Sequence, residues 1–381
     1  MINQGKRGKT RLLNNNVLHD KYLSKALKLA AKGMGMVNPN PMVGALVVKA
    51  GKIVGSGYHE CYGGKHAEVI ALEMAGGEAK GADLYVTLEP CSHKGKTGPC
   101  ADRIISAGIR RVIIPGVDPN PKVRGKGIKR LREKGVEVIS GFCAGDARSL
   151  NEPFFHFMEK GIPYVSLKMA ISVDGFLADQ DGRSKWITSS ISRRHAHRIR
   201  ARHDAILVGT HTLLLDNPSL NVRLRGNYRQ PRKVVIDPRC EVTREMKVFN
   251  EGREDVVIFR TNVGENAVRR GDTLSMEHPV EAIEVKDESI PVKFILDTLG
   301  KRGITSVLVE GGAGTFARFI ESGFVNKLFI FVGGTFLGKG LSPLGQVEGL
   351  SLEKPLPLTV KRVKKIGDDL LMEAVTRVEE H

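Results

Sequence analysis

The sequence contains no apolar run of the roughly 18 to 20 residues that a membrane-spanning helix needs, and its start lacks the apolar segment of a secretory signal. Only 6% of the 381 residues are aromatic, and Trp186 is the single tryptophan. No basic stretch is interleaved with stacking aromatic side chains, as is common in proteins that bind single-stranded nucleic acid. These absences predict a cytoplasmic protein that acts neither on membranes nor on nucleic acid.

Cysteine is also scarce. The five cysteines are Cys61, Cys91, Cys100, Cys143 and Cys240, and their odd number and wide spacing do not fit a disulfide framework. In a reducing compartment, paired cysteines near a histidine more often bind a metal. The net charge of +17 indicates anionic partners, and phosphorylated small molecules fit it without stacking aromatics.

The order of apolar and polar segments predicts two different domains with no internal repeat. Residues 1–20 are basic, with no acidic residue before Asp20, and we expect a short disordered tail there rather than a transit peptide. Strands and helices then alternate over 21–150, which is typical of an α/β layer fold. A second α/β domain is expected over 160–381, with a surface connection from about residue 277 to 292.

A metal site is indicated by the segments "HAEVIALEMAGG" and "LEPCSHKGKTGPC". Catalytic zinc takes three protein ligands and leaves a fourth position for water, and His66, Cys91 and Cys100 supply that number. Glu68 is two residues beyond His66, about 200° around an ideal helix. The two side chains can therefore converge only if the site caps the first turn of the helix.

A closed structural zinc site is the alternative. It would need a fourth ligand, and Cys61 and His93 are poorly placed to provide one. Cys100 follows Pro99 at an expected helix start, where backbone N–H groups and the helix dipole lower the pKa of a thiol. We therefore interpret the site as catalytic, with one Zn²⁺ per chain.

The spacing matches part of the signature of zinc deaminases, H-x-E followed by P-C-x-x-C, in which the glutamate is the general acid and base. The departure is the longer interval between the two cysteines. The inserted loop "SHKGKTGP" is basic, which would suit a substrate that carries a phosphate.

The segments "NPNPMVGALVV", "HAE" and "TLEPCSHKGKTGPC" together resemble the bifunctional riboflavin-biosynthesis deaminase–reductases. The usual "TPPC" of that family appears here with Gly98 in place of one proline. The resemblance implies a cytidine-deaminase-like α/β/α domain, with Glu68 moving the proton and Asn40, His93 and Lys96 contacting the substrate. The implied reaction is hydrolytic deamination of 2,5-diamino-6-(5-phosphoribosylamino)pyrimidin-4(3H)-one.

The second half has no P-loop and no second metal motif. Its segment "ITSVLVEGGAGTFARFIESG" predicts a strand, a glycine-rich turn and a helix, which can hold a phosphate at the helix N-terminus. Gly312, Gly314 and Ala317 satisfy G-x-G-x-x-A, but the acidic residue expected about 20 positions later is missing. We therefore expect a phosphate-binding turn rather than a Rossmann site. Lys168 lies inside an apolar strand, where its charge needs a partner.

Four segments in this half, "LKMAISVDG", "SKWITS", "DNPSLNVR" and "VEGG", resemble in order the reductase half of the same family, whose fold is like that of dihydrofolate reductase. The resemblance implies that NADPH reduces the ribosyl group of 5-amino-6-(5-phosphoribosylamino)uracil to ribityl. The implied NADPH contacts are Ala170, Trp186, Thr212, Asp216, Gly312, Ala313, Gly314, Thr315, Phe316, Ala317 and Arg318. The implied substrate contacts are Lys168, Ser184, Arg200, Leu220, Arg223 and Glu310.

Three other hypotheses remain open at this point. A nucleic-acid deaminase of the tRNA type, with an accessory binding domain, would explain the zinc motif and the charge. A zinc-stabilised binding module would need no catalysis at all. Within the resembling family, one half could have lost its activity, although the motif residues of both are present. A homo-oligomer is expected because most soluble oligomers are built from identical chains.

Overall fold

The computed structural model describes residues 4–92, 98–226, 228–252, 255–261, 280–286 and 289–376. The chain divides into two compact units, Met1–Lys160 and Gly161–His381. Among the described residues, no helix combines the length and the apolar character that crossing a lipid bilayer requires.

The first unit is built on a five-stranded sheet with the order β2-β1-β3-β4-β5. Its strands are β1 (Gly44–Lys49), β2 (Lys52–Tyr58), β3 (Asp83–Val86), β4 (Arg111–Ile114) and β5 (Glu137–Ser140). Strands β3, β4 and β5 run parallel, whereas β1 is antiparallel to both of its neighbours. The hairpin of β1 and β2 turns at Gly51, where φ is +78°.

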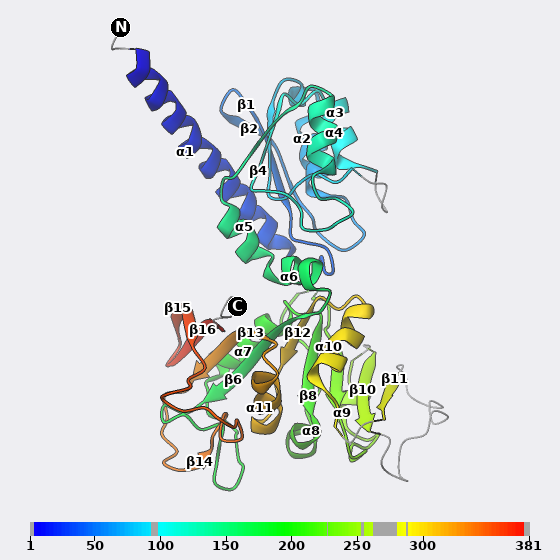
Figure 1. Cartoon of the computed structure of the whole chain (residues 1–381), viewed down its shortest axis with the longest axis vertical. Helices are drawn as coiled ribbons and strands as arrows, with labels where there is room; N and C mark the ends of the chain where they lie inside the picture. Colours follow the sequence, from blue (N-terminus) through cyan, green and yellow to red (C-terminus); the bar gives the residue numbers. More distant parts are fainter. Residues whose placement is uncertain are drawn as a thin grey trace. The chain divides into compact units, whose positions relative to one another are not determined.

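Helices cover both faces of this sheet, which makes three layers (Figure 1). They are α1 (Gln4–Ala30) on one face and α2 (Ala67–Ala75), α3 (Cys100–Ser106) and α4 (Lys126–Glu133) on the other. Helices α5 (Ala144–Leu150) and α6 (Glu152–Lys160) follow β5 along the chain, and 3-10 turns lie at Ala31–Gly33 and Gly76–Ala79. Successive residues of a strand point to opposite faces. Ala45 and Val47 thus pack in the same cluster as α2, α3 and α4, while Leu46 and Val48 pack with α1.

The sequence predicts a disordered tail over residues 1–20, whereas the structure has α1 from Gln4 onward. The helix is anchored at its C-terminal half. Leu23 and Ala26 are fully buried, and Nδ1 of the buried His19 lies 3.0 Å from the hydroxyl of Tyr85. No proline interrupts the chain before this anchor, so the helix can extend toward the N-terminus.

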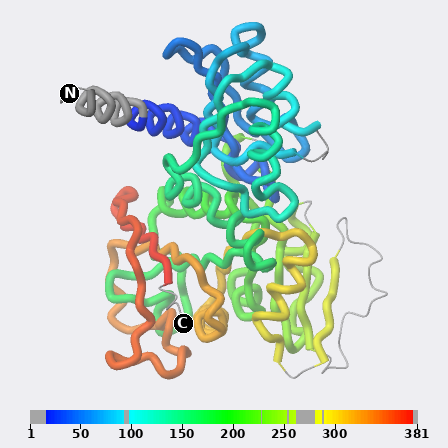
Figure 2. The backbone as a smooth tube through the Cα atoms, turned by 45° about the horizontal axis from the view of Figure 1, so that its top comes forward, coloured from blue at the N-terminus to red at the C-terminus, as the bar shows by residue number. Residues whose placement is uncertain are grey.

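The second unit contains a nine-stranded sheet with the order β11-β10-β9-β8-β12-β6-β13-β16-β15. Its strands are β6 (Tyr164–Ile171), β8 (Ala205–Gly209), β9 (Arg232–Ile236), β10 (Val256–Thr261), β11 (Val280–Val285), β12 (Ser306–Val309), β13 (Val325–Val332), β15 (Leu358–Ile366) and β16 (Asp369–Thr376). The first seven strands in spatial order run parallel, and β16 is antiparallel to both of its neighbours. The short strands β7 (Ala178–Asp179) and β14 (Gly340–Leu341) pair separately. The two ends of the large sheet, β11 and β15, are seen in Figure 2.

Three strands of this sheet were not predicted as such. The interval 277–292 was expected to be a surface connection, but its described part contains β11, which pairs in parallel with β10. The hairpin of β15 and β16 is likewise absent from the expected elements. Strand β11 and the hairpin lie at the two edges of the sheet. Half of the β11 side chains and most of the β15 side chains face solvent, so the apolar alternation of a half-buried strand is lost.

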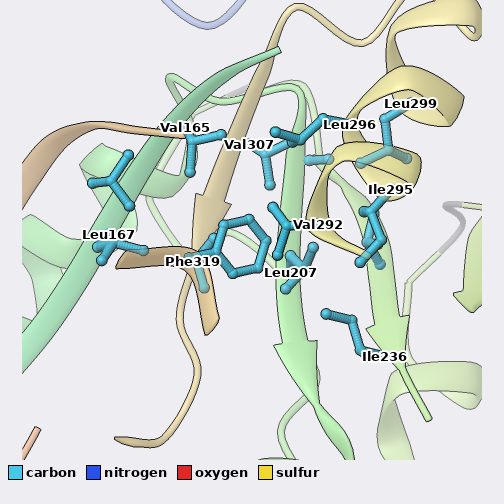
Figure 3. Packing of buried hydrophobic residues seen from close by; sticks show 14 of the residues in the cluster. Val165, Leu167, Leu207, Ile236, Val292, Ile295, Leu296, Leu299, Val307 and Phe319 are labelled. Atoms are coloured by element: carbon cyan, nitrogen blue, oxygen red, sulfur yellow. The ribbon is translucent and has the colours of Figure 1, made fainter. Parts of the chain in front are cut away.

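Five helices flank the large sheet: α7 (Ser190–Arg200), α8 (Thr210–Asp216), α9 (Lys247–Asn250), α10 (Val292–Lys301) and α11 (Ala313–Glu321). Leu207 and Val307 pack on one face with Leu296 of α10 and Phe319 of α11 (Figure 3). On the opposite face, Leu308 packs with α7. The core therefore fixes the ends of β6, β8 and β12, where a ligand crevice is expected in a sheet of this type.

Replacement of Leu207, which is fully buried, by alanine should lower the free energy of unfolding of the second unit. A cavity of this kind typically costs about 2 to 5 kcal/mol. Urea unfolding followed by the fluorescence of Trp186 measures the change, because the only tryptophan lies in this unit. Leu352→Ala, at a position 97% exposed, is the control. Equal effects of the two substitutions would contradict the assigned core.

Candidate active sites

The three predicted zinc ligands lie together in the first unit. His66 is the N-cap residue of α2, Cys91 follows β3, and Cys100 is the first residue of α3. One ligand atom from each lies within 4.8 Å of the others. Nδ1 of His66 is 3.1 Å from Sγ of Cys100 and 3.6 Å from Sγ of Cys91. These three residues can hold one metal ion.

The two thiols share hydrogen bonds that prepare them for a cation. Sγ of Cys91 accepts from the thiol and from the backbone N–H of Cys100, and the thiol bond is the main reason why the pKa of Cys91 is lowered to about 4. The same contact and burial raise the pKa of Cys100, which is opposite to the lowering expected from its place at a helix start. A bound cation would replace the shared proton and stabilise both thiolates. A histidine with two thiolates is the donor set of catalytic zinc sites, so zinc fits these residues.

Glu68 lies in the first turn of α2 and is 4% exposed. His66 has the extended backbone of an N-cap (φ −71°, ψ 155°), which is the arrangement required for the two side chains to converge. Burial raises the pKa of the Glu68 carboxyl, and the nearby His66 opposes this only in part. A carboxyl group with a raised pKa can take up and release a proton near neutral pH.

Asn40 is positioned by a histidine that the sequence did not single out. Nδ2 of Asn40 donates to Nε2 of His59 at 3.2 Å, and Nδ1 of His59 donates to the carbonyl oxygen of Lys65 at 3.0 Å. The His59 ring is 3% exposed and meets the ring of His66 edge to face, with 5.6 Å between centroids. This chain leaves Oδ1 of Asn40 as an acceptor. His93 and Lys96 lie outside the described residues.

In the second unit, three of the predicted substrate residues form one charged cluster. Arg200 donates to both carboxylate oxygens of Glu310, at 2.6 and 2.9 Å, and Nζ of Lys168 lies 3.6 Å from Oε2. The strand register explains the contact. Val309, the last residue of β12, pairs with Leu167 of β6, so Lys168 and Glu310 lie level at the end of β12.

The cluster keeps its carboxylate ionised. Burial alone would raise the pKa of Glu310, but Arg200 and Lys168 outweigh it and lower the pKa to about 2. His197 is also next to the cluster and was not predicted. Its pKa is lowered to about 4 by burial and then by Arg200 and Arg223, and its Nδ1 accepts from the backbone N–H of Arg223 at 3.3 Å.

The predicted cofactor turn lies at the start of α11, against the start of α8. A Cβ atom at Gly209 would lie 2.6 Å from Oγ1 of Thr315, and one at Gly311 would lie 2.5 Å from Cβ of Thr315. A Cβ atom at Gly312 would be 3.7 Å from Oγ1 of Thr212. The close approach at Gly209 and Gly311 requires glycine, whereas 3.7 Å at Gly312 is an ordinary contact. The first N–H groups of α11 can bind a phosphate. The turn therefore fits a dinucleotide phosphate.

The remaining predicted cofactor residues differ in what they can offer. Trp186 is 68% exposed, with the guanidinium of Arg193 4.1 Å from its ring centroid, and Asp216 pairs with Lys185 at 3.2 Å. The side chains of Ala313, Phe316 and Ala317 are buried, Ala170 packs against the core cluster of α7, and Arg318 donates to the carbonyl oxygen of Ile290. Contact with a cofactor at Ala313 or Phe316 is therefore limited to the backbone.

One predicted substrate residue, Leu220, can contribute little through its side chain in this structure. Leu220 is 2% exposed and its side chain packs in the core with α8 and α9, so only its backbone, with φ +55°, can face a ligand. Ser184 is half-buried. The cluster of Lys168, Arg200 and Glu310 is therefore the centre of this site.

Two family models match the chain. Residues 17–115 match the cytidine and deoxycytidylate deaminase zinc-binding region, and residues 163–372 match the RibD C-terminal domain. The riboflavin biosynthesis protein RibD of Aquifex aeolicus (strain VF5) is 43% identical over 92% of this chain and 96% of that protein. The protein of the same name from Bacillus amyloliquefaciens is 43% identical over 94% and 97%.

The chain belongs to the bifunctional RibD family of riboflavin biosynthesis. Solved structures agree over nearly the whole length. RibD of Acinetobacter baumannii superposes with a TM-score of 0.87 at 33% identity, covering 95% of this chain and all of that one. The diaminohydroxyphosphoribosylaminopyrimidine deaminase/5-amino-6-(5-phosphoribosylamino)uracil reductase of Thermotoga maritima gives 0.84 at 37% identity, with the same coverage.

Membership of the RibD family confirms the predicted fold classes, a cytidine-deaminase-like unit followed by a dihydrofolate-reductase-like unit. It also confirms a bifunctional deaminase and reductase that uses Zn²⁺ and NADPH. The nucleic-acid deaminase hypothesis is not favoured, because the second half of the chain matches a reductase domain.

Glu310→Gln should destabilise the second unit at pH 7, because it leaves Arg200 and Lys168 without their counter-charge. Removing one partner of a buried pair typically costs about 3 to 5 kcal/mol. The pKa of Glu310 is about 2, against an ordinary value of 4.5, so its contribution is complete above pH 4.5 and is lost as the pH falls toward 2.

The difference in the free energy of unfolding between parent and variant should therefore decrease as the pH falls from 4.5 toward 2. Urea unfolding followed by Trp186 fluorescence measures this difference. Glu241→Gln, at an exposed carboxylate of the same unit, is the control and should behave like the parent. A gap that stays constant from pH 7 to pH 2 would contradict the ion pair.

Proposed function

We propose that residues 21–150 deaminate 2,5-diamino-6-(5-phosphoribosylamino)pyrimidin-4(3H)-one and that residues 160–381 then reduce the ribosyl group of 5-amino-6-(5-phosphoribosylamino)uracil to ribityl. One observation carries the proposal. A single chain holds the His66, Cys91 and Cys100 cluster beside a buried carboxyl group, and also holds a compensated Arg200–Glu310–Lys168 cluster. The solved Thermotoga maritima relative bears the names of both activities.

In the deaminase unit, we assign zinc to His66, Cys91 and Cys100. Bound zinc supplies an acidified water at neutral pH. Glu68 takes a proton from the attacking water and gives it to the leaving nitrogen, so that a C–O bond forms at the ring carbon, the C–N bond breaks and ammonia departs. Asn40 accepts a hydrogen bond from the substrate through Oδ1, and His93 and Lys96 bind the substrate from the loop between the cysteines.

In the reductase unit, NADPH supplies the hydride that reduces C1′ of the ribose. The chain binds and orients the two partners. Trp186, Thr212 and Asp216, with the turn from Gly312 onward, contact the cofactor. Arg200 and Arg223 bind the phosphate together with Ser184. Lys168 lies near the reacting sugar.

Glu310 has a role different from the one that the resemblance implied. A carboxylate repels a phosphate, and both of its oxygens accept from Arg200. We assign Glu310 to orienting Arg200 and Lys168 toward the substrate rather than to direct contact with the phosphate.

The cysteines and the net charge bear on the compartment and the partners of the protein. All five cysteines are free thiols, and thiolate ligands persist in a reducing compartment, so we place the protein in the cytoplasm. We also propose a homo-oligomer that binds no nucleic acid. Its partners are phosphoribosylated pyrimidines, and the net charge of +17 attracts these anions.

The test follows product mass when the zinc-loaded protein meets the diaminopyrimidinone phosphate, with and without NADPH. The parent should form the aminouracil alone, and its ribityl form once NADPH is added. Glu68→Gln should reduce deamination by at least about 10²-fold, keep its zinc, and still reduce aminouracil that is supplied directly. Glu73→Gln, at an exposed glutamate of the same helix, is the matched control.

Two results would contradict the proposal. Absence of any mass change in the zinc-loaded parent would exclude the assigned substrate. Full deamination by Glu68→Gln would remove Glu68 from the proton transfer.

A further inference from the structure

Glu89 is a buried carboxylate that the mechanism does not use. Its side chain belongs to a residue only 4% exposed, and it accepts four backbone hydrogen bonds. Oε1 accepts from Gly127 at 2.9 Å and from Ile128 at 3.1 Å, while Oε2 accepts from Gly125 at 2.9 Å and from Asp118 at 3.1 Å. All four donors lie 29 to 39 positions away along the chain.

Two of these donors are the N-terminal N–H groups of α4. The N-cap residue of α4 is Gly125, in the left-handed conformation (φ 74°) and without a side chain that could cap the helix. Gly127 and Ile128 are the second and third residues of the helix, whose N–H groups an N-cap side chain normally accepts. Glu89 therefore caps α4 from a distant segment, with its negative charge at the favourable end of the helix.

The cap brings the backbone of α4 against the segment that carries Cys91. A Cβ atom at Gly127 would lie 1.8 Å from the carbonyl oxygen of Pro90, so these two backbones are in direct contact. On its other side, Cys91 is held by α3, because its carbonyl oxygen accepts from the N–H of Ala101 at 3.0 Å. The backbone of Pro90 and Cys91 is thus held between the first turns of α4 and α3.

We propose that Glu89 is a positioning residue of the zinc centre, which holds Cys91 at the distance from His66 and Cys100 that zinc requires. This inference rests on the proposed zinc ligation. Outer partners that orient metal ligands typically change metal affinity by about 10- to 100-fold when they are mutated. Glu89 acts here through the backbone of its own segment rather than through a bond to the ligand.

The test compares the zinc affinity of full-length variants by competition with a chelator. Glu89→Gln keeps the size of the side chain but places an NH₂ group against two N–H donors. We expect about 10- to 100-fold weaker zinc binding and an altered thiolate-to-cobalt absorption band in the Co²⁺-substituted protein. Glu89→Asp keeps the charge but has a shorter side chain, so we expect an intermediate loss of zinc affinity. This variant replaces Glu89→Gln in the comparison if the glutamine variant does not fold.

Asp83→Asn is the matched control, since Asp83 is a half-buried carboxylate of β3 in the same unit that pairs with Arg111 at 2.9 Å. It should lower the melting temperature without weakening zinc binding. The reductase activity, which belongs to the other unit, measures the amount of protein in each sample independently of the zinc centre.

Three results would overturn the inference. The first is a zinc affinity of Glu89→Gln within threefold of the parent, and the second is an equal loss in Asp83→Asn, which would indicate general destabilisation. The third is a parent that binds no zinc, which would overturn the proposed ligation together with this inference. If the parent binds zinc tightly and Glu89→Gln binds it equally well, the proposed zinc ligation stands and only the role of Glu89 is contradicted.

Discussion

Moving an ionised side chain out of water costs several kcal/mol unless the protein replaces the lost solvent, and both sites of this chain are built under that constraint. Glu310 is compensated by Arg200 and Lys168, and its pKa is accordingly low. Glu89 is compensated by four backbone N–H groups. Glu68 has only partial compensation, and burial raises its pKa. Of these three carboxyl groups, Glu68 has the least compensation for a negative charge, and it is the one whose proposed role is to carry a proton.

Helix N-termini supply much of the positive potential at these sites. His66 caps α2, Cys100 begins α3, and Glu89 accepts from the start of α4. In the second unit, the turn at Gly312 begins α11. First-turn N–H groups have no partner within their own helix and favour thiolates, carboxylates and phosphates. The positions of the helices therefore determine where each unit can bind anionic groups.

The sequence predicted what depends on local pattern. The apolar segment before the glycine-rich turn located β12, and the motif spacing predicted that His66, Cys91 and Cys100 form one metal site. Long-range contacts escaped it. The role of Glu89 could not be predicted from its neighbours in the sequence, because its four hydrogen-bond donors lie far along the chain. The basic strand β15 could not be predicted either, because it is defined by its pairing with β16. The contact of His19 in α1 with Tyr85 is another long-range contact of this kind.

X-ray absorption at the zinc edge of the full-length protein tests most directly the claim that this is an open catalytic site. The account predicts two sulfur ligands at about 2.3 Å, one imidazole nitrogen at about 2.0 to 2.1 Å and one further light atom from water. The further ligand should change when an anion that binds zinc is added, while the sulfur shell stays constant. Three sulfur ligands, or a second histidine that no added anion displaces, would show a closed structural site and contradict the account.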